Sequence, residues 1–207
     1  MFNPLIDTPP DNFNDYPIAT SYRVVLEYFR LCRDSGLDDT EKGYLATSLF
    51  FKVEGEGPDK ALEVLSRYGQ DVFEFIAWYI SRGAADDESE AERVEKERVE
   101  KEEDRVFDIL VDSERIFAGF RQAYGIDLRF ENMHWWDFLT LLNNIPESTR
   151  LSDVMRIRGQ KLPKPTKHNG EELERMQKLK RKFLLGGETE EEERMNDSAA
   201  AIFGAWG

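Results

Sequence analysis

Hydrophobic side chains recur at intervals of three or four residues along most of this 207-residue chain. That spacing gathers them on one side of an α-helix, whereas a half-buried strand would place them at every second position. No stretch alternates over the length of a strand, and Gly or Pro stands where most periodic stretches end. The pattern therefore predicts an all-α fold of about eight helices.

The clearest pattern covers residues 112–159 and predicts three helices. The first begins at Asp112 or Ser113, whose short side chains suit an N-cap, and ends at Gly125, which adopts a left-handed backbone without strain. The second spans about 132–144, and its apolar side chains occupy so much of its circumference that it must be covered on most sides. We expect a second core here, with these residues packed together: Phe117, Phe120, Tyr124, Trp135, Phe138 and Leu142.

A helix near the N-terminus is predicted to begin at Thr20 or Ser21. Its apolar residues leave only Arg23, Glu27 and Arg30 as a clear polar face. A helix with so narrow a polar face is typical of a protein core.

Other helices are expected to bury a single stripe. The helix that starts at 38–40 should bury Leu45, and the helix that opens near Glu171 carries an apolar stripe that must dock on something. Ser148 or Thr149 should cap the third helix of the 112–159 stretch. Cys32 has apolar neighbours on a helical projection, so we expect a buried, inert thiol that forms no intramolecular disulfide.

The domain organisation follows from these patterns and from the placement of charge. We expect two helical units joined by a charged linker. The expected segments are an irregular arm (1–19), an N-terminal helical unit (20–83), an acidic linker or solvated helix (84–105), a C-terminal helical unit (106–186) with a basic segment (150–182), and a tail (187–207).

A further signal is the order of certain residues along the second unit. These are Asp112, Ile116-Phe117, Phe120, Tyr124-Gly125-Ile126-Asp127-Leu128, Met133-His134-Trp135-Trp136-Asp137-Phe138 and Ile157-Arg158-Gly159. The order resembles a family of small tailed-bacteriophage proteins, encoded beside the tape-measure gene in phages and prophages of Gram-positive bacteria. The resemblance extends from Met1 to about Gly186 and brings no catalytic motif.

The gene position and size of that family resemble those of tail assembly chaperones, which coat the tape-measure protein until tail-tube subunits replace them. The resemblance therefore implies a chaperone that binds the tape-measure protein in the host cell cytoplasm and is absent from the mature virion. Self-association, or pairing with a frameshift-extended sibling, is a further expectation. A structural tail component that stays in the virion is the main alternative.

Charge adds a weaker alternative. The net charge is −14, which favours solubility and repels phosphate backbones. Residues 150–182 nevertheless carry a net charge of +7, against −7 over 86–104. A nucleic-acid-binding accessory could use the basic segment, but aromatic residues that could stack on bases are missing from it. The positive charge of residues 150–182 is equally well explained as a complement to the negative charge of residues 86–104.

The sequence carries little catalytic chemistry. His134 and His168 are the only histidines, and neither has a cysteine or a second histidine at metal-ligand spacing. No serine is framed as a nucleophile, and no glycine loop has the spacing of a phosphate-binding motif. We expect no enzyme, no metal and no cofactor. No apolar run approaches the ~20 residues of a membrane-spanning helix, so no membrane partner is expected either.

Partner-binding residues are expected among exposed aromatic and Met side chains, because such side chains commonly anchor interfaces. Trp136 projects to the margin of the apolar arc, so it either packs under a neighbouring helix or belongs to an exposed groove. If a groove exists, Met133 and Trp136 are the first candidates to line it. Phe183 and Leu184 are the second pair.

Overall fold

The computed structural model describes residues 2–51, 59–83 and 106–185, so the predicted linker and tail lie outside it. Within those ranges the chain is predominantly helical, and the predicted all-α fold is confirmed. The helices are α1 (Tyr22–Arg33), α2 (Asp39–Phe50), α3 (Asp59–Tyr68), α4 (Gln70–Ile80), α6 (Ser113–Tyr124), α7 (Trp135–Asn143), α8 (Arg150–Gly159) and α9 (Gly170–Lys182). The N-terminal arm adds one antiparallel ribbon, in which β1 (Asn12–Phe13) pairs with β2 (Tyr16–Pro17).

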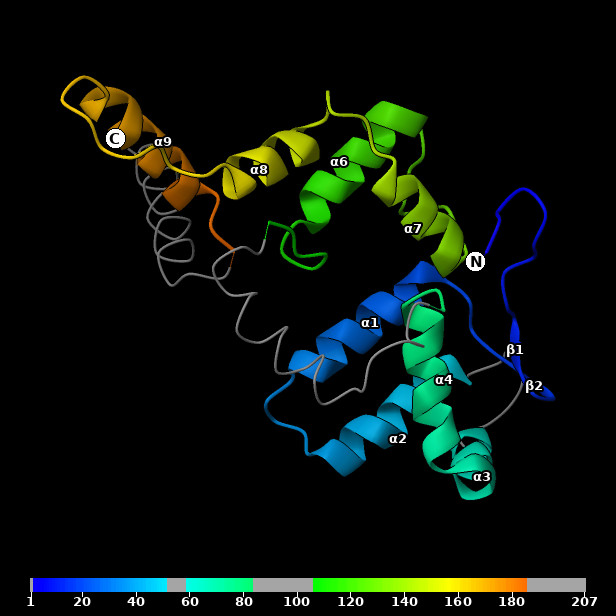
Figure 1. The fold of residues 1–207 in the computed structure, drawn as a ribbon. Coiled ribbons are helices and arrows are strands. Elements are labelled where there is room, and N and C mark those ends of the chain that lie inside the picture. The colour runs from blue at the N-terminus through cyan, green and yellow to red at the C-terminus, as the bar shows by residue number, and fades with distance from the viewer. Residues whose placement is uncertain (1, 52–58, 84–105, 186–207) are drawn as a thin grey trace, which may run out of the picture.

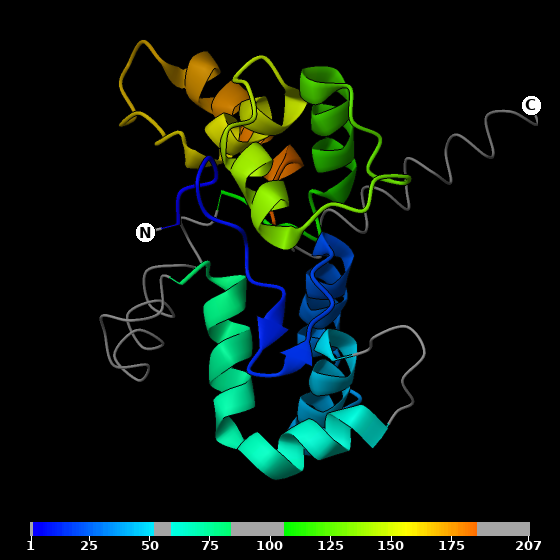
Figure 2. The same ribbon diagram turned by 90° about the vertical axis from the view of Figure 1, so that its right-hand side faces the viewer.

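Helix α1 lies in the middle of the molecule (Figure 1). Helices α2, α3 and α4 lie on one side of it together with the β-ribbon, and α6, α7 and α8 lie on the other (Figures 1 and 2). Both α2 and α7 pack directly on α1. Helix α9 follows α8 at the edge of the molecule, so it is the element farthest from the centre.

Most helix ends follow from single residues that the sequence identifies. The Ser21 and Thr149 hydroxyls accept backbone N–H bonds in the first turns of α1 and α8. Asp38 and Glu41 form a reciprocal capping box at the start of α2. Gly125 takes φ +69° after α6, the left-handed conformation that ends a helix. These predicted boundaries are confirmed.

The buried side chains form one continuous cluster that runs from Tyr16 to Leu151. The residues expected to form a second core do pack on one another, since the Phe138 ring stacks on Phe120 at 5.1 Å and on Trp135 at 5.7 Å. Tyr22 of α1 stacks on the other side of Phe138 at 4.7 Å. The two expected cores are therefore joined through α1, while the predicted unit boundaries stay a prediction.

Helix α7 begins against the last turn of α4. We call Tyr79, Ile80, His134, Trp135 and Trp136 the tryptophan junction. The indole Nε1 of Trp136 donates to the Tyr79 carbonyl at 2.8 Å, and that of Trp135 donates to the Ile80 carbonyl at 3.0 Å. The two tryptophans are 4% and 2% exposed. Of the two alternatives for Trp136, packing against a neighbouring helix is the one that the structure shows.

The His134 side chain gives α7 a cap that the sequence analysis did not foresee. Its Nδ1 accepts the backbone N–H of Trp136 at 3.0 Å, and its Nε2 lies 3.2 Å from the Pro10 carbonyl. These partners assign the proton to Nε2 and leave Nδ1 free as an acceptor. Burial lowers the pKa of His134, although the hydrogen bond to Pro10 and the charge of Asp137 oppose that effect.

Two expectations about burial are wrong, because Cys32 is exposed and Leu45 of α2 is 38% exposed. The apolar stripe that was expected to dock does so only in part: Phe183, directly after α9, is 5% exposed, but none of the residues within α9 is buried. A helical projection shows which side of a helix is apolar, but it does not show whether another element covers that side.

Candidate functional site

Helix α1 presents two different sides to its surroundings. On one side Val25 is completely buried, and Tyr28 and Phe29 pack against the core cluster. The other side carries Leu26, Glu27, Arg30, Leu31, Arg33 and Asp34, which recur at intervals of one to three residues and therefore share a face. That face is the floor of a hollow on the surface of the described residues.

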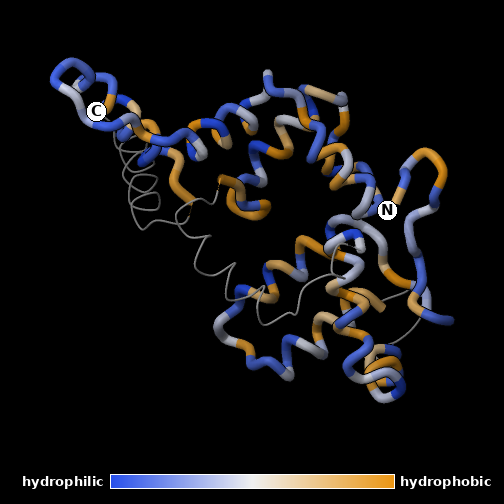
Figure 3. The backbone as a smooth tube through the Cα atoms, viewed as in Figure 1, coloured by the Kyte–Doolittle hydropathy of each residue, from blue (hydrophilic) through white to orange (hydrophobic). Residues whose placement is uncertain are grey.

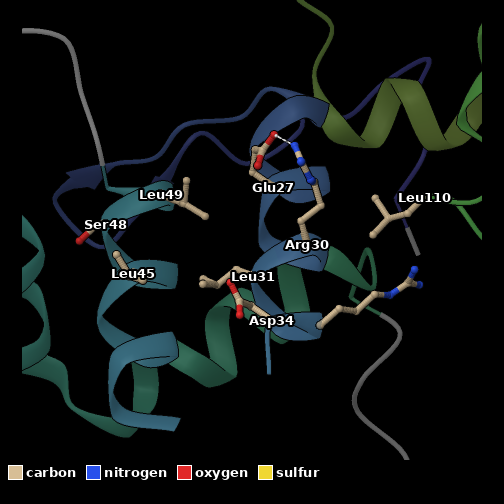
Figure 4. Close-up of a pocket in the computed structure, with 9 residues that line it drawn as sticks. Glu27, Arg30, Leu31, Asp34, Leu45, Ser48, Leu49 and Leu110 are labelled. Atoms are coloured by element: carbon tan, nitrogen blue, oxygen red, sulfur yellow. Dashed lines mark hydrogen bonds and ion pairs between the residues drawn. The ribbon is translucent and has the colours of Figure 1, made fainter. Parts of the chain in front are cut away.

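The hollow has a volume of about 690 Å³ and lies between α1, α2 and the loop before α6 (Figure 4). Leu45 and Leu49 project into it from α2, and Leu110 projects from the loop. Leu31 of α1 lies between them. Four leucines from three separate parts of the chain thus surround one open space.

Three of the charged side chains of this hollow form ion pairs, and the fourth, Asp34, accepts the Gly36 backbone N–H at 2.8 Å. Arg30 donates to Glu27 at 3.0 Å, and Arg33 donates to the Asp108 carboxylate at 2.6 Å. Burial alone would raise the pKa of Asp108, but the bonds from Arg33 and from the Val111 and Leu110 backbone amides outweigh it and hold the pKa below its ordinary value.

The ion pair between α1 and the loop has a positional consequence. Asp108 is 4% exposed, and its Oδ1 accepts the Leu110 backbone N–H at 2.9 Å. Because Arg33 holds the same carboxylate, the loop is fixed to the end of α1 with Leu110 at the edge of the hollow. The pairing of Arg33 with Asp108 thus positions an apolar group, Leu110, beside the floor of the hollow.

A second hollow of about 450 Å³ continues along the first half of α1. Leu26 and Ile109 line it beside Glu27 and Leu110, which line the first hollow. Its other lining residues are Tyr22, Arg23, Ser113, Ile116, Phe117, Leu128, Arg129 and Phe138. We call the two hollows together the α1 groove.

Arg23 fixes the far wall of the α1 groove. Its Nη2 donates to the backbone carbonyls of Leu128 at 2.8 Å, Arg129 at 2.7 Å and Glu131 at 3.2 Å. The Tyr22 hydroxyl donates to the same Leu128 carbonyl at 2.5 Å. The residues that looked like a solvated polar face of α1 therefore tie the loop after α6 to this helix.

The four residues predicted to bind a partner lie elsewhere. Trp136 is buried in the tryptophan junction, and Met133 is half-buried beside it. Phe183 is 5% exposed, whereas Leu184 is 44% exposed. The structure brings Met133 and Trp136 together and Phe183 and Leu184 together, but it does not bring the two pairs to one surface.

The sequence analysis missed the leucines of the α1 groove. One signal was available: the apolar arc of α1 is wider than a single packing partner can cover. We interpreted that width as deeper burial, whereas it reflects a core on one side and an open groove on the other. Nothing in the sequence indicated that Leu110 lines the groove, because its loop reaches α1 only in the folded protein.

The lining of the α1 groove combines leucine side chains with charged side chains of α1. In the described parts of the chain, no three His, Cys, Asp or Glu side chains are grouped so that they could hold a metal ion. None of the helices described is long and apolar enough to cross a membrane. Along α1, whose 12 residues extend about 18 Å, the groove offers apolar side chains among charged ones.

Comparisons with known proteins agree with the resemblance that the sequence shows. Neither a curated protein nor a solved structure is significantly similar to the chain. Residues 5–185 do match a protein family described as the bacteriophage Gp15 protein. That match covers most of the chain and all the residues that line the α1 groove, so the chain belongs to the bacteriophage Gp15 family.

Proposed function

We propose that the protein is a tail assembly chaperone that binds an apolar helical segment of the tape-measure protein in the α1 groove. The observation that carries the proposal is the group of four leucines around an open hollow, on a phage protein whose other large apolar side chains are mostly packed. The resemblance to proteins encoded beside the tape-measure gene supplies the client. The role involves no catalytic step, no metal and no cofactor.

The dimensions of the groove favour a helical client. A helix of about 18 Å has roughly three turns and presents apolar side chains at i, i+3 or i+4, and i+7. Such a row matches leucines that come from α1, α2 and the loop. Tape-measure segments that later pack together would expose rows of this kind before assembly.

The size of the groove favours reversible binding. A groove about as long as α1 contacts only about three turns of a client helix, and small contacts are typical of transient interfaces. Weak binding suits a chaperone that must give way to tail-tube subunits. The net charge of −14 supports the same role, because it favours solubility at high copy number.

The ion pairs weigh against a nucleic-acid-binding role. Arg158, in the basic segment, is 9% exposed and is bound to Asp112, and Arg156 is bound to Asp153. Part of the positive charge of that segment is therefore used within the protein. Phosphate binding would need those groups to be free.

Co-expression with the tape-measure protein, followed by affinity capture, tests the proposal. Leu45→Glu places a charge in the groove, and Leu62→Glu is the matched control because Leu62 is 52% exposed on α3, outside the groove. We expect Leu45→Glu to weaken client binding roughly thirtyfold, the scale of an interface anchor, and Leu62→Glu to leave it unchanged.

Equal binding by the two variants would refute the groove as the client site. Purified virions provide the second test, since a chaperone should be absent from them. Stoichiometric copies in finished particles would instead identify a structural tail component.

A further inference from the structure

Helix α9 has an apolar stripe that the described part of the molecule leaves open. Leu173, Met176 and Leu179 lie on one side of the helix, and Leu184 lies one turn further on. Leu179 is 36% exposed and Leu184 is 44% exposed. Figure 3 shows hydrophobic positions recurring within this otherwise hydrophilic stretch.

The helix is held to the body mainly at its C-terminal end. The residue that follows it, Phe183, is buried between the guanidinium groups of Arg115 and Arg150. Its carbonyl accepts a hydrogen bond from Arg158 Nε, and Arg158 also donates to both carboxylate oxygens of Asp112, at 2.6 and 3.1 Å. This anchorage fixes the position of α9 and leaves its apolar stripe accessible.

The charges of α9 are divided between its two halves. We call Glu171, Glu172 and Glu174 the acidic half, and Lys178, Lys180, Arg181 and Lys182 the basic half. Negative charge at the N-terminus and positive charge at the C-terminus both stabilise a helix through its dipole. Among the described residues, however, no ion pair involves any of these side chains.

We propose that α9 pairs with α9 of a second copy of this chain in antiparallel orientation. Antiparallel pairing about a two-fold axis near Met176 would place each acidic half beside the basic half of the other helix. It would also bring Leu173 of one helix opposite Leu179 of the other and cover both stripes. The same surface serves both copies, as a two-fold interface requires.

The acidic stretch at residues 86–104 is a less suitable partner for this surface. Its net charge of −7 matches the basic half but repels the acidic half. A second α9 matches both halves at once. The pairing is also independent of the proposed client groove, because α9 contributes none of the residues that line it.

A charge exchange in the full-length protein tests the pairing. One variant carries Glu171→Lys, Glu172→Lys and Glu174→Lys, and the other carries Lys178→Glu, Arg181→Glu and Lys182→Glu. Each alone should dimerise at least tenfold more weakly than the parent in sedimentation equilibrium, because like charges then face each other. An equimolar mixture should form a heterodimer at least as tight as the parent dimer, and salt should weaken it.

Single leucine variants keep the test valid if the reversed charges unfold α9. Leu179→Glu should dissociate the parent dimer while the far-ultraviolet circular dichroism stays unchanged, and Leu62→Glu on α3 should leave the dimer intact. A parent protein that is monomeric at all concentrations would overturn the proposal. So would a dimer that survives Leu179→Glu, or two charge variants that both retain α9 yet fail to associate when mixed.

Discussion

The tryptophan junction and helix α9 both carry large apolar side chains but use them in opposite ways. In the junction Trp135 and Trp136 are almost completely buried, and each indole N–H has a backbone acceptor. In α9 none of the residues is buried. The two regions differ less in the hydrophobicity of their side chains than in the hydrogen-bond acceptors and packing space that a neighbouring element provides.

Helix α4 offers the junction two carbonyl groups. The last four carbonyls of a helix have no partner within it, and Tyr79 and Ile80 are the final residues of α4. The two indoles of α7 satisfy these carbonyls and fill the space beside them. A buried tryptophan needs an acceptor for its N–H, so a helix end is a better partner for it than a helix side.

The largest effect is expected at the junction. Trp135→Ala should lower the free energy of unfolding by about 3–5 kcal/mol, because it leaves a cavity and an unsatisfied Ile80 carbonyl. Urea unfolding followed by circular dichroism measures this. Trp135→Phe keeps much of the volume and should cost less. A Trp135→Ala protein as stable as the parent would show that Trp135 contributes no more to the free energy of unfolding than an exposed residue does.

A smaller, pH-dependent effect is expected at His134. The unfolded imidazole gains a proton near pH 6.5, whereas burial lowers its pKa in the folded protein. The stabilisation is therefore complete above about pH 6.5 and is lost as the pH falls through the lowered pKa. The loss should be about 1 kcal/mol, the usual contribution of an N-cap.

His134→Asn is the matched control, because Asn caps α7 without titrating. Unfolding free energies at pH 7.5 and 5.5 should differ less in this variant than in the parent. The same pH dependence in both proteins would assign it to other groups, including carboxylates such as Asp108.

The smallest effect is expected on α9. Leu179→Ser should change the free energy of unfolding by less than about 0.5 kcal/mol, as is usual for exposed positions. Measurements at low protein concentration avoid any contribution from pairing between copies. A loss above about 2 kcal/mol would mean that the stripe is covered within one chain, and the contrast with the junction would disappear.

The local features of the fold could be predicted from the sequence. Asp38, Thr149 and Gly125 each mark a helix end through their own chemistry, and the structure confirms all three. The cap supplied by His134 was missed, because a histidine can cap a helix only when another group holds its second nitrogen. That group is the Pro10 carbonyl, 124 residues away in the chain.

The candidate site could not be predicted, for a related reason. Periodicity identified the apolar residues of α1 and α2, but whether Leu45 is covered depends on where α6 and its preceding loop lie. Trp136, which projects to the margin of an apolar arc, and Phe183, which belongs to an apolar stripe, were candidates for partner binding. Each is in fact covered by groups distant in sequence: Trp136 by Tyr79, and Phe183 by Arg115 and Arg150.

The continuity of the core has a consequence for the synthesis of the protein. The backbone N–H of Trp135 donates to the Thr20 carbonyl at 2.8 Å, so the first helix completes its contacts only after α7 has left the ribosome. At about 5–20 residues per second, the roughly 70 residues from Ile80 to Leu151 take about 4–14 s to translate. During that interval the apolar side of α1 is not yet covered by α7, and the proposed client likewise has uncovered apolar side chains before assembly.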